Sequence, residues 1–291
     1  MIRTLIIAIS CMGCLVQGLS QSGNAQKLLE PVGFYSDMMV NAEGDDHRIK
    51  AYDLFEEAMS NFLSEKGSYD ISLDSIRWIS VLHGLDFRIV TWQLKVSRSE
   101  YKYGGFIQWT DRIVVMKDTR PWVNGAQRNT YSPSAWYGAL YYKIIPFEKD
   151  KQTYYLLFGF NAENENENTK VADVLNVTSP EPKFGLPVFV GRDEAQSRLI
   201  LTYSDISPLQ LIYDESQKAV VHDHLFSLEG AGPEGGSLIV SDGSQEGWIY
   251  KNGLFHYQEE MYDVQVEQPP MTDERKDRVE TKDILGRPKK Q

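Results

Sequence analysis

Gly247-Trp248-Ile249-Tyr250-Lys251-Asn252-Gly253-Leu254-Phe255-His256-Tyr257 is the stretch that decides the fold, because it predicts a β-hairpin with a two-residue turn. Asn252 and Gly253 tolerate the positive φ angles that a type I′ turn requires at both central positions. Apolar and polar residues alternate on either side of the turn, and this alternation fixes the strand register. The register pairs Tyr250 with Phe255 and Trp248 with Tyr257, and each aromatic pair contributes about 0.2–1 kcal/mol.

Short apolar or alternating runs of the same kind precede this hairpin from residue 71 onward. Val90, Trp92 and Leu94 alternate with polar neighbours, which is typical of a strand with one face toward a core. Residues 154–160 are apolar on both faces and predict a central strand. The sequence therefore predicts a mainly β fold with an antiparallel multi-stranded sheet. It leaves a meander, a sandwich, a barrel-like sheet and a propeller-like arrangement open.

One amphipathic helix is predicted at about residues 46–66, N-terminal to the strands. Asp45 or Asp46 can cap its first turn, and Gly67 can end it. Its apolar residues recur at spacings of three and four: Ile49, Tyr52, Phe55, Met59, Phe62 and Leu63. The interpretation divides the chain into a signal peptide (1–25), an N-terminal helical segment (26–70), an antiparallel β domain (71–263) and a disordered charged tail (264–291).

The first residues have the three parts of a secretory signal. Arg3 supplies a positive start, an apolar core runs from Leu5 to about Val16, and small residues follow, with Ser20 and Ala25 as the favoured cleavage positions. An apolar core of this length is too short to remain as a membrane-spanning anchor. We therefore expect an exported protein of the periplasm or the extracellular space. The alternative is a lipoprotein anchored through Cys14 or Cys11, although neither cysteine follows the expected leucine.

Composition narrows the class of protein further. The two cysteines, Cys11 and Cys14, both lie in the predicted signal, so the remaining chain offers no disulfide framework. The 291 residues carry 30 basic and 41 acidic side chains, a net charge of −11. This balance argues against nucleic acid as a partner, because binding a phosphate backbone requires a basic surface. Beyond the signal, no segment is long and apolar enough to predict a transmembrane helix.

Six segments taken in order resemble a family of uncharacterised exported bacterial proteins, over roughly residues 70–260. The resemblance implies export and carries no activity with it. In that family an apolar aromatic residue stands at the position of His222. The segments are Arg88-Ile89-Val90-Thr91-Trp92-Gln93, Tyr103-Gly104-Gly105-Phe106-Ile107-Gln108, Trp136-Tyr137-Gly138-Ala139-Leu140-Tyr141-Tyr142, Phe184-Gly185-Leu186-Pro187-Val188-Phe189, Leu211-Ile212-Tyr213-Asp214-Glu215 and Val221-His222-Asp223-His224-Leu225.

His222 and His224 are the metal-ligand candidates. They lie two residues apart on a predicted strand, so both imidazoles project from one face, as a shared zinc ion would require. A zinc site needs a third ligand, and none stands at a diagnostic spacing. The sequence therefore favours ordinary strand histidines, and no cofactor is predicted.

Asp223 lies between Val221 and Leu225, where the alternation predicts burial. We interpret it as a structural hydrogen-bond acceptor that ties a loop to the sheet. The alternative is an acidic catalytic group, with Asp214 or Glu215 as a second carboxylate about 5–10 Å away and His224 nearby. The sequence contains no spacing rule that would bring these acids together.

Two polar segments have simpler interpretations than a binding loop. Residues 161–168 alternate Asn and Glu and offer oxygen ligands that suit calcium, but they lack the spacing of an EF-hand and predict a solvated hairpin tip. Residues 230–237 are rich in glycine but lack a following lysine, so we expect a flexible loop.

Aromatic residues make up 12% of the chain, and exposed Tyr or Trp can anchor a protein or stack on a sugar. The sequence thus favours an exported cell-envelope protein with a non-catalytic binding or scaffold role toward an envelope protein or glycan. The alternative is an envelope glycan hydrolase that uses a carboxylate pair.

Overall fold

The computed structural model describes residues 23–119, 125–162, 164–178, 181–191 and 194–262. The chain divides into two units, Met1–Met261 and Tyr262–Gln291, and the fold below is that of the first. The predicted signal peptide lies outside the described residues up to residue 22. The predicted charged tail, residues 264–291, lies outside them entirely.

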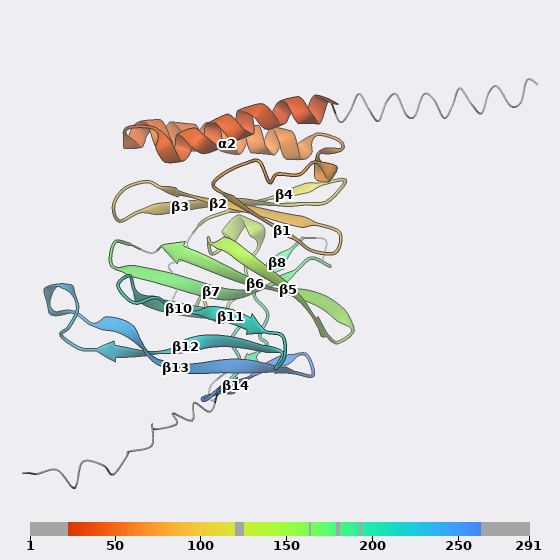
Figure 1. The fold of residues 1–291 in the computed structure, drawn as a ribbon. Coiled ribbons are helices and arrows are strands. Elements are labelled where there is room, and N and C mark those ends of the chain that lie inside the picture. Colours follow the sequence, from red (N-terminus) through yellow and green to blue (C-terminus); the bar gives the residue numbers. More distant parts are fainter. Residues whose placement is uncertain (1–22, 120–124, 163, 179–180, 192–193, 263–291) are drawn as a thin grey trace, which may run out of the picture. The chain divides into compact units, whose positions relative to one another are not determined.

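Two helices and three sheets form layers that follow the order of the chain with one exception (Figure 1). Residues 189–190 join the third sheet, although residues 199–204, which follow them, belong to the second. The helical layer comprises a helix over residues 23–41 and helix α2 (Asp45–Ser64), followed by the 3-10 turn η1 (Ser68–Asp70). The first sheet has the order β1 (Ile79–His83), β2 (Arg88–Lys95), β3 (Tyr101–Gln108) and β4 (Ile113–Lys117).

The second and third sheets have five strands each. The second has the order β10 (Leu199–Ser204), β7 (Glu167–Asn176), β6 (Gln152–Ala162) and β5 (Leu140–Lys149), and β8 (Lys183–Phe184) pairs with β7. The third has the order β11 (Leu211–Asp214), β12 (Ala219–Leu228), β13 (Leu238–Lys251), β14 (Leu254–Gln258) and β9 (Phe189–Val190). Two further 3-10 turns, η2 (Pro133–Ala135) and η3 (Pro233–Gly235), lie in loops.

The predicted mainly β, antiparallel fold is confirmed, with two refinements. The strands divide into three stacked sheets, and the described strands close no barrel. All pairs are antiparallel except β14 with β9, which is a parallel pair of two residues. In the hairpin of residues 247–257 the predicted register is confirmed, since Tyr250 faces Phe255 and Trp248 faces Tyr257. Asn252 and Gly253 have φ angles of 54° and 82°, as the type I′ turn requires.

The prediction of a single N-terminal helix is wrong, because residues 23–41 form a second one. This segment contains Pro31 and Gly33, which are unfavourable inside a helix. Residue propensities therefore do not predict a helix at residues 23–41. Tertiary packing overrides that preference. Leu29, Val32 and Met39 are buried in the core between the helices and the first sheet, and a Cβ on Gly33 would lie 3.4 Å from the Ile76 side chain.

The predicted helix at residues 46–66 is α2, and it buries the predicted apolar face. Phe55 and Phe62 are fully buried, and the Phe55 ring meets Trp92 of β2 edge to face at 5.0 Å. A helix covers one face of the first sheet in this way, and the second sheet covers the other. β2 is therefore buried on both faces, so that the polar Arg88 and Thr91 of its alternating sequence are buried as well.

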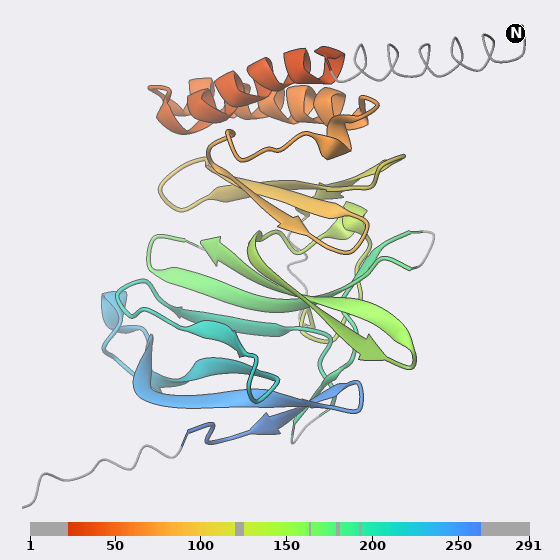
Figure 2. The same cartoon turned by 45° about the vertical axis from the view of Figure 1, so that its right-hand side comes forward.

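The second sheet also has two buried faces, because it lies between the first and third sheets (Figure 2). β6, predicted as a central strand, pairs with a strand on each side, β7 and the edge strand β5. Its Tyr155 and Leu157 belong to the core shared with the first sheet, whereas Leu156 and Phe158 belong to the core shared with the third.

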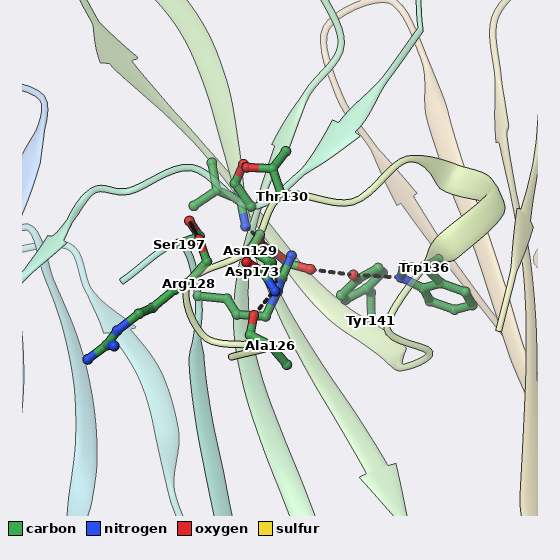
Figure 3. A network of polar contacts seen from close by, with 11 residues as sticks. Ala126, Arg128, Asn129, Thr130, Trp136, Tyr141, Asp173 and Ser197 are labelled. Atoms are coloured by element: carbon green, nitrogen blue, oxygen red, sulfur yellow. Dashed lines mark hydrogen bonds and ion pairs between the residues drawn. The ribbon is translucent and has the colours of Figure 1, made fainter. Parts of the chain in front are cut away.

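A buried ion pair fixes the loop of residues 125–131 to the second sheet (Figure 3). Arg198 Nε donates to Asp173 Oδ1 at 3.1 Å, and neither side chain is exposed. The Arg198 guanidinium also donates to the backbone carbonyls of Ala126 and Asn129 in the loop. Burial raises the pKa of the Asp173 carboxyl, and the charge of Arg198 opposes that shift.

The same network continues into the core between the first and second sheets. Tyr141 Oη donates to Asp173 Oδ2 at 3.4 Å, and Trp136 Nε1 donates to Tyr141 Oη at 2.9 Å (Figure 3). Gly185 lies against the ion pair with φ 93°, and a Cβ there would be 2.7 Å from Arg198 Nη2. Only glycine suits that position, because an L side chain would be both strained and in collision.

A second buried arginine, Arg88 of β2, connects the helical layer with the first sheet. Its guanidinium donates to the Gln108 side chain (2.7 Å) and to the carbonyls of Ile71 (2.8 Å) and Ser68 (3.0 Å). Gln108 in turn donates to the carbonyl of Leu63 at the end of α2. Burial lowers the pKa of Arg88. These hydrogen bonds satisfy the backbone carbonyls where α2 ends and the chain turns toward the first sheet.

Candidate binding site

The acids proposed as a catalytic pair do not converge. Asp214 ends β11 and lies opposite Ala219, whereas Asp223 stands four residues further along β12. At a rise of about 3.3 Å per residue the two positions are roughly 13 Å apart along the sheet, outside the separation that glycoside hydrolysis uses. Asp214 Oδ1 instead accepts hydrogen bonds from the backbone N–H groups of Ser216 and Gln217, and Glu215 lies in that turn.

Asp223 has the role of a structural acceptor that the sequence predicted, although it is half-buried rather than buried. Its Oδ2 accepts a hydrogen bond from the backbone N–H of Gln210 at 2.6 Å, and its Oδ1 accepts one from Gln245 Nε2 at 3.2 Å. The register between β12 and β13 shifts directly after Asp223, so the alternation that predicted its burial is interrupted there.

His222 and His224 project from the same face of β12, as predicted, and they share one carboxylate. His222 Nδ1 lies 3.6 Å from Glu246 Oε1, and His224 Nδ1 lies 3.5 Å from Glu246 Oε2. Tyr257 Oη also donates to Glu246. Within the described ranges, no group of three or more His, Cys, Asp or Glu residues could hold a metal ion. The pair has the local partners expected of ordinary strand histidines.

Burial lowers the pKa of His222, so it gives the protein a pH dependence with a definite sign. As the pH falls below about 6.5, the histidine of the unfolded chain takes up a proton before the folded one does. The free energy of unfolding then decreases with falling pH, with a slope of at most ~1.4 kcal/mol per pH unit from this group. We expect His222→Phe to flatten the pH dependence of urea unfolding between pH 7.5 and 5. An unchanged slope in this variant would show that the acid sensitivity arises elsewhere.

A polar hollow of about 670 Å³ lies at the tip of the β6–β7 hairpin, beside the loop of residues 231–238. It contains Asn164, Asn166 and Glu167, from the run that suits calcium. These groups bond to one another: Asn164 Oδ1 accepts the backbone N–H groups of Asn166 (2.8 Å) and Glu167 (3.0 Å). This arrangement is the predicted hairpin tip, in which the Asn164 side chain closes the turn.

An apolar pocket of about 320 Å³ lies where the helical layer, the start of β1 and the start of β5 meet. Five of its eight lining residues are apolar, and two of the polar ones are cationic. One polar atom in it, Gln93 Oε1, is buried and has no hydrogen-bond partner in the described part of the chain. The lining residues are Met39, Val40, Arg48, Trp78, Ile79, Gln93, Lys95 and Leu140.

Trp78 at the rim of this pocket has an unusual backbone conformation. Its φ is 66°, in the left-handed region, where a bulky side chain is disfavoured. The other non-glycine residues with positive φ in the described chain are Asp150, Lys151, Lys218 and Asn252, which are polar turn residues. Trp78 Nε1 donates to Asp37 Oδ1 of the first helix at 3.0 Å, and the Arg77 guanidinium lies 5.6 Å from the indole ring. The indole is therefore fixed in position although it is 44% exposed.

Further apolar side chains are exposed beside Trp78. Phe34 (60% exposed) and Met38 lie one helical turn apart, on the side of the first helix that carries Asp37, the partner of the indole. Val40 is exposed at the end of the same helix. We call Phe34, Met38, Val40 and Trp78 the Trp78 surface. Its apolar side chains and the adjoining pocket are suited to binding, and they bring no nucleophile or general base together.

Sequence patterns did not predict this site. Its residues come from both helices, from the segment before β1 and from three strands, and no local spacing connects them. Trp78 stands between the charged Arg77 and the apolar Ile79, so its neighbours in sequence did not distinguish it from a core tryptophan.

No helix within the described ranges has the length and hydrophobicity to cross a bilayer. The chain matches no model of a protein family, no curated protein and no solved structure.

Proposed function

We propose that this protein is an exported, non-catalytic binding protein that recognises a partner of the cell envelope through the Trp78 surface. The observation that carries the proposal is the conformation of Trp78. A left-handed backbone at a bulky residue costs about 1–3 kcal/mol, and such strain is concentrated at functional sites. Here the strain places an indole at the rim of an apolar pocket, where it can anchor a partner.

Export is supported by the signal-like residues 3–16 and by the absence of cysteine beyond them. Of the two predicted cleavage positions, Ser20 suits the fold better. Ala25 is fully buried within the first helix, so cleavage after Ala25 would remove the beginning of that helix, whereas cleavage after Ser20 leaves residues 23–41 intact.

The glycan hydrolase has less support than the binding protein. The separation of Asp214 from Asp223 and the hydrogen bonds of both carboxylates suit structural roles, and His224 pairs with Glu246. Among the described residues, no contact around Asp214 and Asp223 favours acid–base chemistry.

Site-specific photocrosslinking in the cells that produce the protein tests the proposal. Benzoylphenylalanine at position 78 is expected to give one defined adduct, whose second component mass spectrometry identifies. The same group at position 228 is the control, because Leu228 is a similarly exposed apolar residue of β12, in the third sheet. Equal adducts at both positions, or none at position 78, would contradict the proposed site.

The identified partner, once purified, allows a quantitative prediction. Trp78→Ala is expected to weaken its binding at least tenfold, because buried aromatic anchors carry about 2 kcal/mol or more of binding free energy. Leu228→Ala should leave the affinity unchanged. Isothermal titration calorimetry with the wild type and both variants measures these differences. An affinity that Trp78→Ala does not change would mean that the partner binds elsewhere.

A further inference from the structure

β1 is an edge strand, and its free edge begins at the Trp78 pocket. It pairs with β2 on one side, and among the described residues no strand pairs with its other edge (Figures 1 and 2). β5 of the second sheet packs against β1, and Ser80 Oγ donates to the Tyr141 carbonyl. Trp78 directly precedes the strand, and Ile79, its first residue, lines the pocket. An extended segment along this edge would therefore have one end at the pocket.

The hydrogen-bonding pattern shows which backbone groups of β1 point outward. Gly84 N–H donates to the Phe87 carbonyl at 2.9 Å, which makes this a hydrogen-bonded pair next to the two-residue turn. Antiparallel pairs alternate between hydrogen-bonded and non-hydrogen-bonded. Ser80 and Leu82 therefore bond to β2, whereas the N–H and C=O groups of Ile79, Val81 and His83 point away from it. These outward groups have no backbone partner within the described chain.

This edge lacks the features by which proteins prevent strands from pairing with other chains. Charged side chains, proline and bulges are the usual protection. β5, at the edge of the second sheet, has all three, with Lys143, Pro146 and a register irregularity between Tyr141 and Lys143. β1 is Ile-Ser-Val-Leu-His and has no lysine, proline or bulge. Exposed apolar residues stand at both of its ends, Trp78 and Leu85, which is 79% exposed.

The charges at the pocket end indicate a preference for acidic residues. Lys95 lines the pocket and Arg77 lies beside the indole ring, whereas Arg48, which also lines the pocket, is paired with Asp45. Three cations stand against two carboxylates at this end, those of Asp45 and Asp37, whereas acidic side chains outnumber basic ones in the whole chain, whose net charge is −11. A segment with an acidic residue near an apolar one would complement this end in charge and in polarity.

We infer that β1 accepts an additional strand from an extended segment of a partner protein, which places an apolar side chain in the Trp78 pocket and an acidic side chain near Lys95 and Arg77. This inference rests on the proposed function and names the mode of binding. Backbone hydrogen bonds to Ile79, Val81 and His83 supply affinity, and the pocket supplies specificity, as in other complexes formed by strand addition. A second copy of the chain is the less suitable occupant, because two molecules of charge −11 repel each other.

A phage library of random decapeptides is the probe, panned against the full chain. Selected peptides are expected to alternate apolar and polar residues and to include an acidic residue. Val81→Pro removes an outward N–H that no internal bond uses, so it should reduce binding of the synthetic selected peptide at least tenfold with little change in melting temperature. Val81→Ala is the matched control, because it shortens the same side chain but keeps the N–H. It should bind within about threefold of the wild type.

A scan of N-methylated peptides tests the same inference on the unaltered protein. If the peptide adds a strand, N-methylation should abolish binding at every second residue and leave it intact at the residues between, because only alternate N–H groups face β1. This scan decides the question even if Val81→Pro fails to fold. Uniform tolerance of N-methylation, or unchanged binding to Val81→Pro, would overturn strand addition.

Trp78→Ala separates the two proposals. If it weakens peptide binding while Val81→Pro and the N-methyl scan have no effect, the Trp78 surface binds its partner without strand addition. If it has no effect, the peptide does not use the Trp78 surface, and strand addition at this site fails. If no selected peptide binds the wild type more tightly than it binds Trp78→Ala, strand addition at this site is also rejected. The crosslinking experiment at position 78 does not depend on this selection and tests the proposed function independently. Dimers of the wild type that Val81→Pro dissociates would identify a second copy as the occupant and refute a separate partner.

Discussion

Arg198→Met is expected to lower the free energy of unfolding by about 3–5 kcal/mol, because it leaves the fully buried carboxylate of Asp173 without its cation. The same change removes the donors to the Ala126 and Asn129 carbonyls, so the loop of residues 125–131 loses its attachment to the second sheet. Urea unfolding of the wild type and the variant, monitored by far-UV circular dichroism, measures the difference.

The double variant Arg198→Met/Asp173→Leu is the control for this prediction. Replacing both members of a buried ion pair by apolar residues removes the unpaired charge. The double variant should therefore be more stable than the sum of the two single changes predicts, with a coupling energy of about 0.5–3 kcal/mol. A loss below about 1 kcal/mol in Arg198→Met would contradict the role that we give the ion pair.

Trp92→Ala is expected to cost about 3–5 kcal/mol, since it opens a cavity between the helical layer and the first sheet. Trp92 is fully buried, and its ring meets Phe55 of α2 at 5.0 Å and Phe106 of β3 at 5.6 Å. A Cβ on Gly104 would lie 2.5 Å from the indole, so this space is filled to van der Waals contact. The loss should weaken the attachment of α2 more than it weakens the third sheet.

Hydrogen exchange measured by mass spectrometry checks where the stability is lost. In Trp92→Ala, peptides of α2 should exchange faster, and peptides of β12 and β13 should change least. Trp78→Ala is the matched control, because it truncates the same type of residue at a half-exposed position and should cost less than about 1 kcal/mol. Equal losses in the two variants would mean that Trp92 does not connect the layers as described.

Local patterns in the sequence predicted much of the fold. The hairpin of residues 247–257 was predicted together with its strand register, because its turn residues and its alternation of apolar and polar residues are local features of the sequence. The apolar face of α2 was predicted for the same reason. The first helix was not, because Pro31 and Gly33 oppose it locally and the packing that outweighs them involves Ile76, more than forty residues away.

The site could not be predicted from spacing, for a related physical reason. The Trp78 pocket is assembled from segments as distant as Met39 and Leu140, and the φ of Trp78 is set by this assembly rather than by its own preference. The predicted acids illustrate the opposite case. Asp214 and Asp223 are close in sequence, but the extended geometry of β12 holds them apart.

The layers follow the order of the chain, and this has a consequence for how the protein is made. The helices can collapse on the first sheet before the second has been synthesised, and each later sheet then condenses on a finished surface. Apart from β9, which pairs with the last strand β14, a molecule that emerges N-terminus first from a ribosome or a translocation pore does not wait for its C-terminal strands to complete the earlier cores. Assembly in this direction keeps the nascent apolar surface small at every stage.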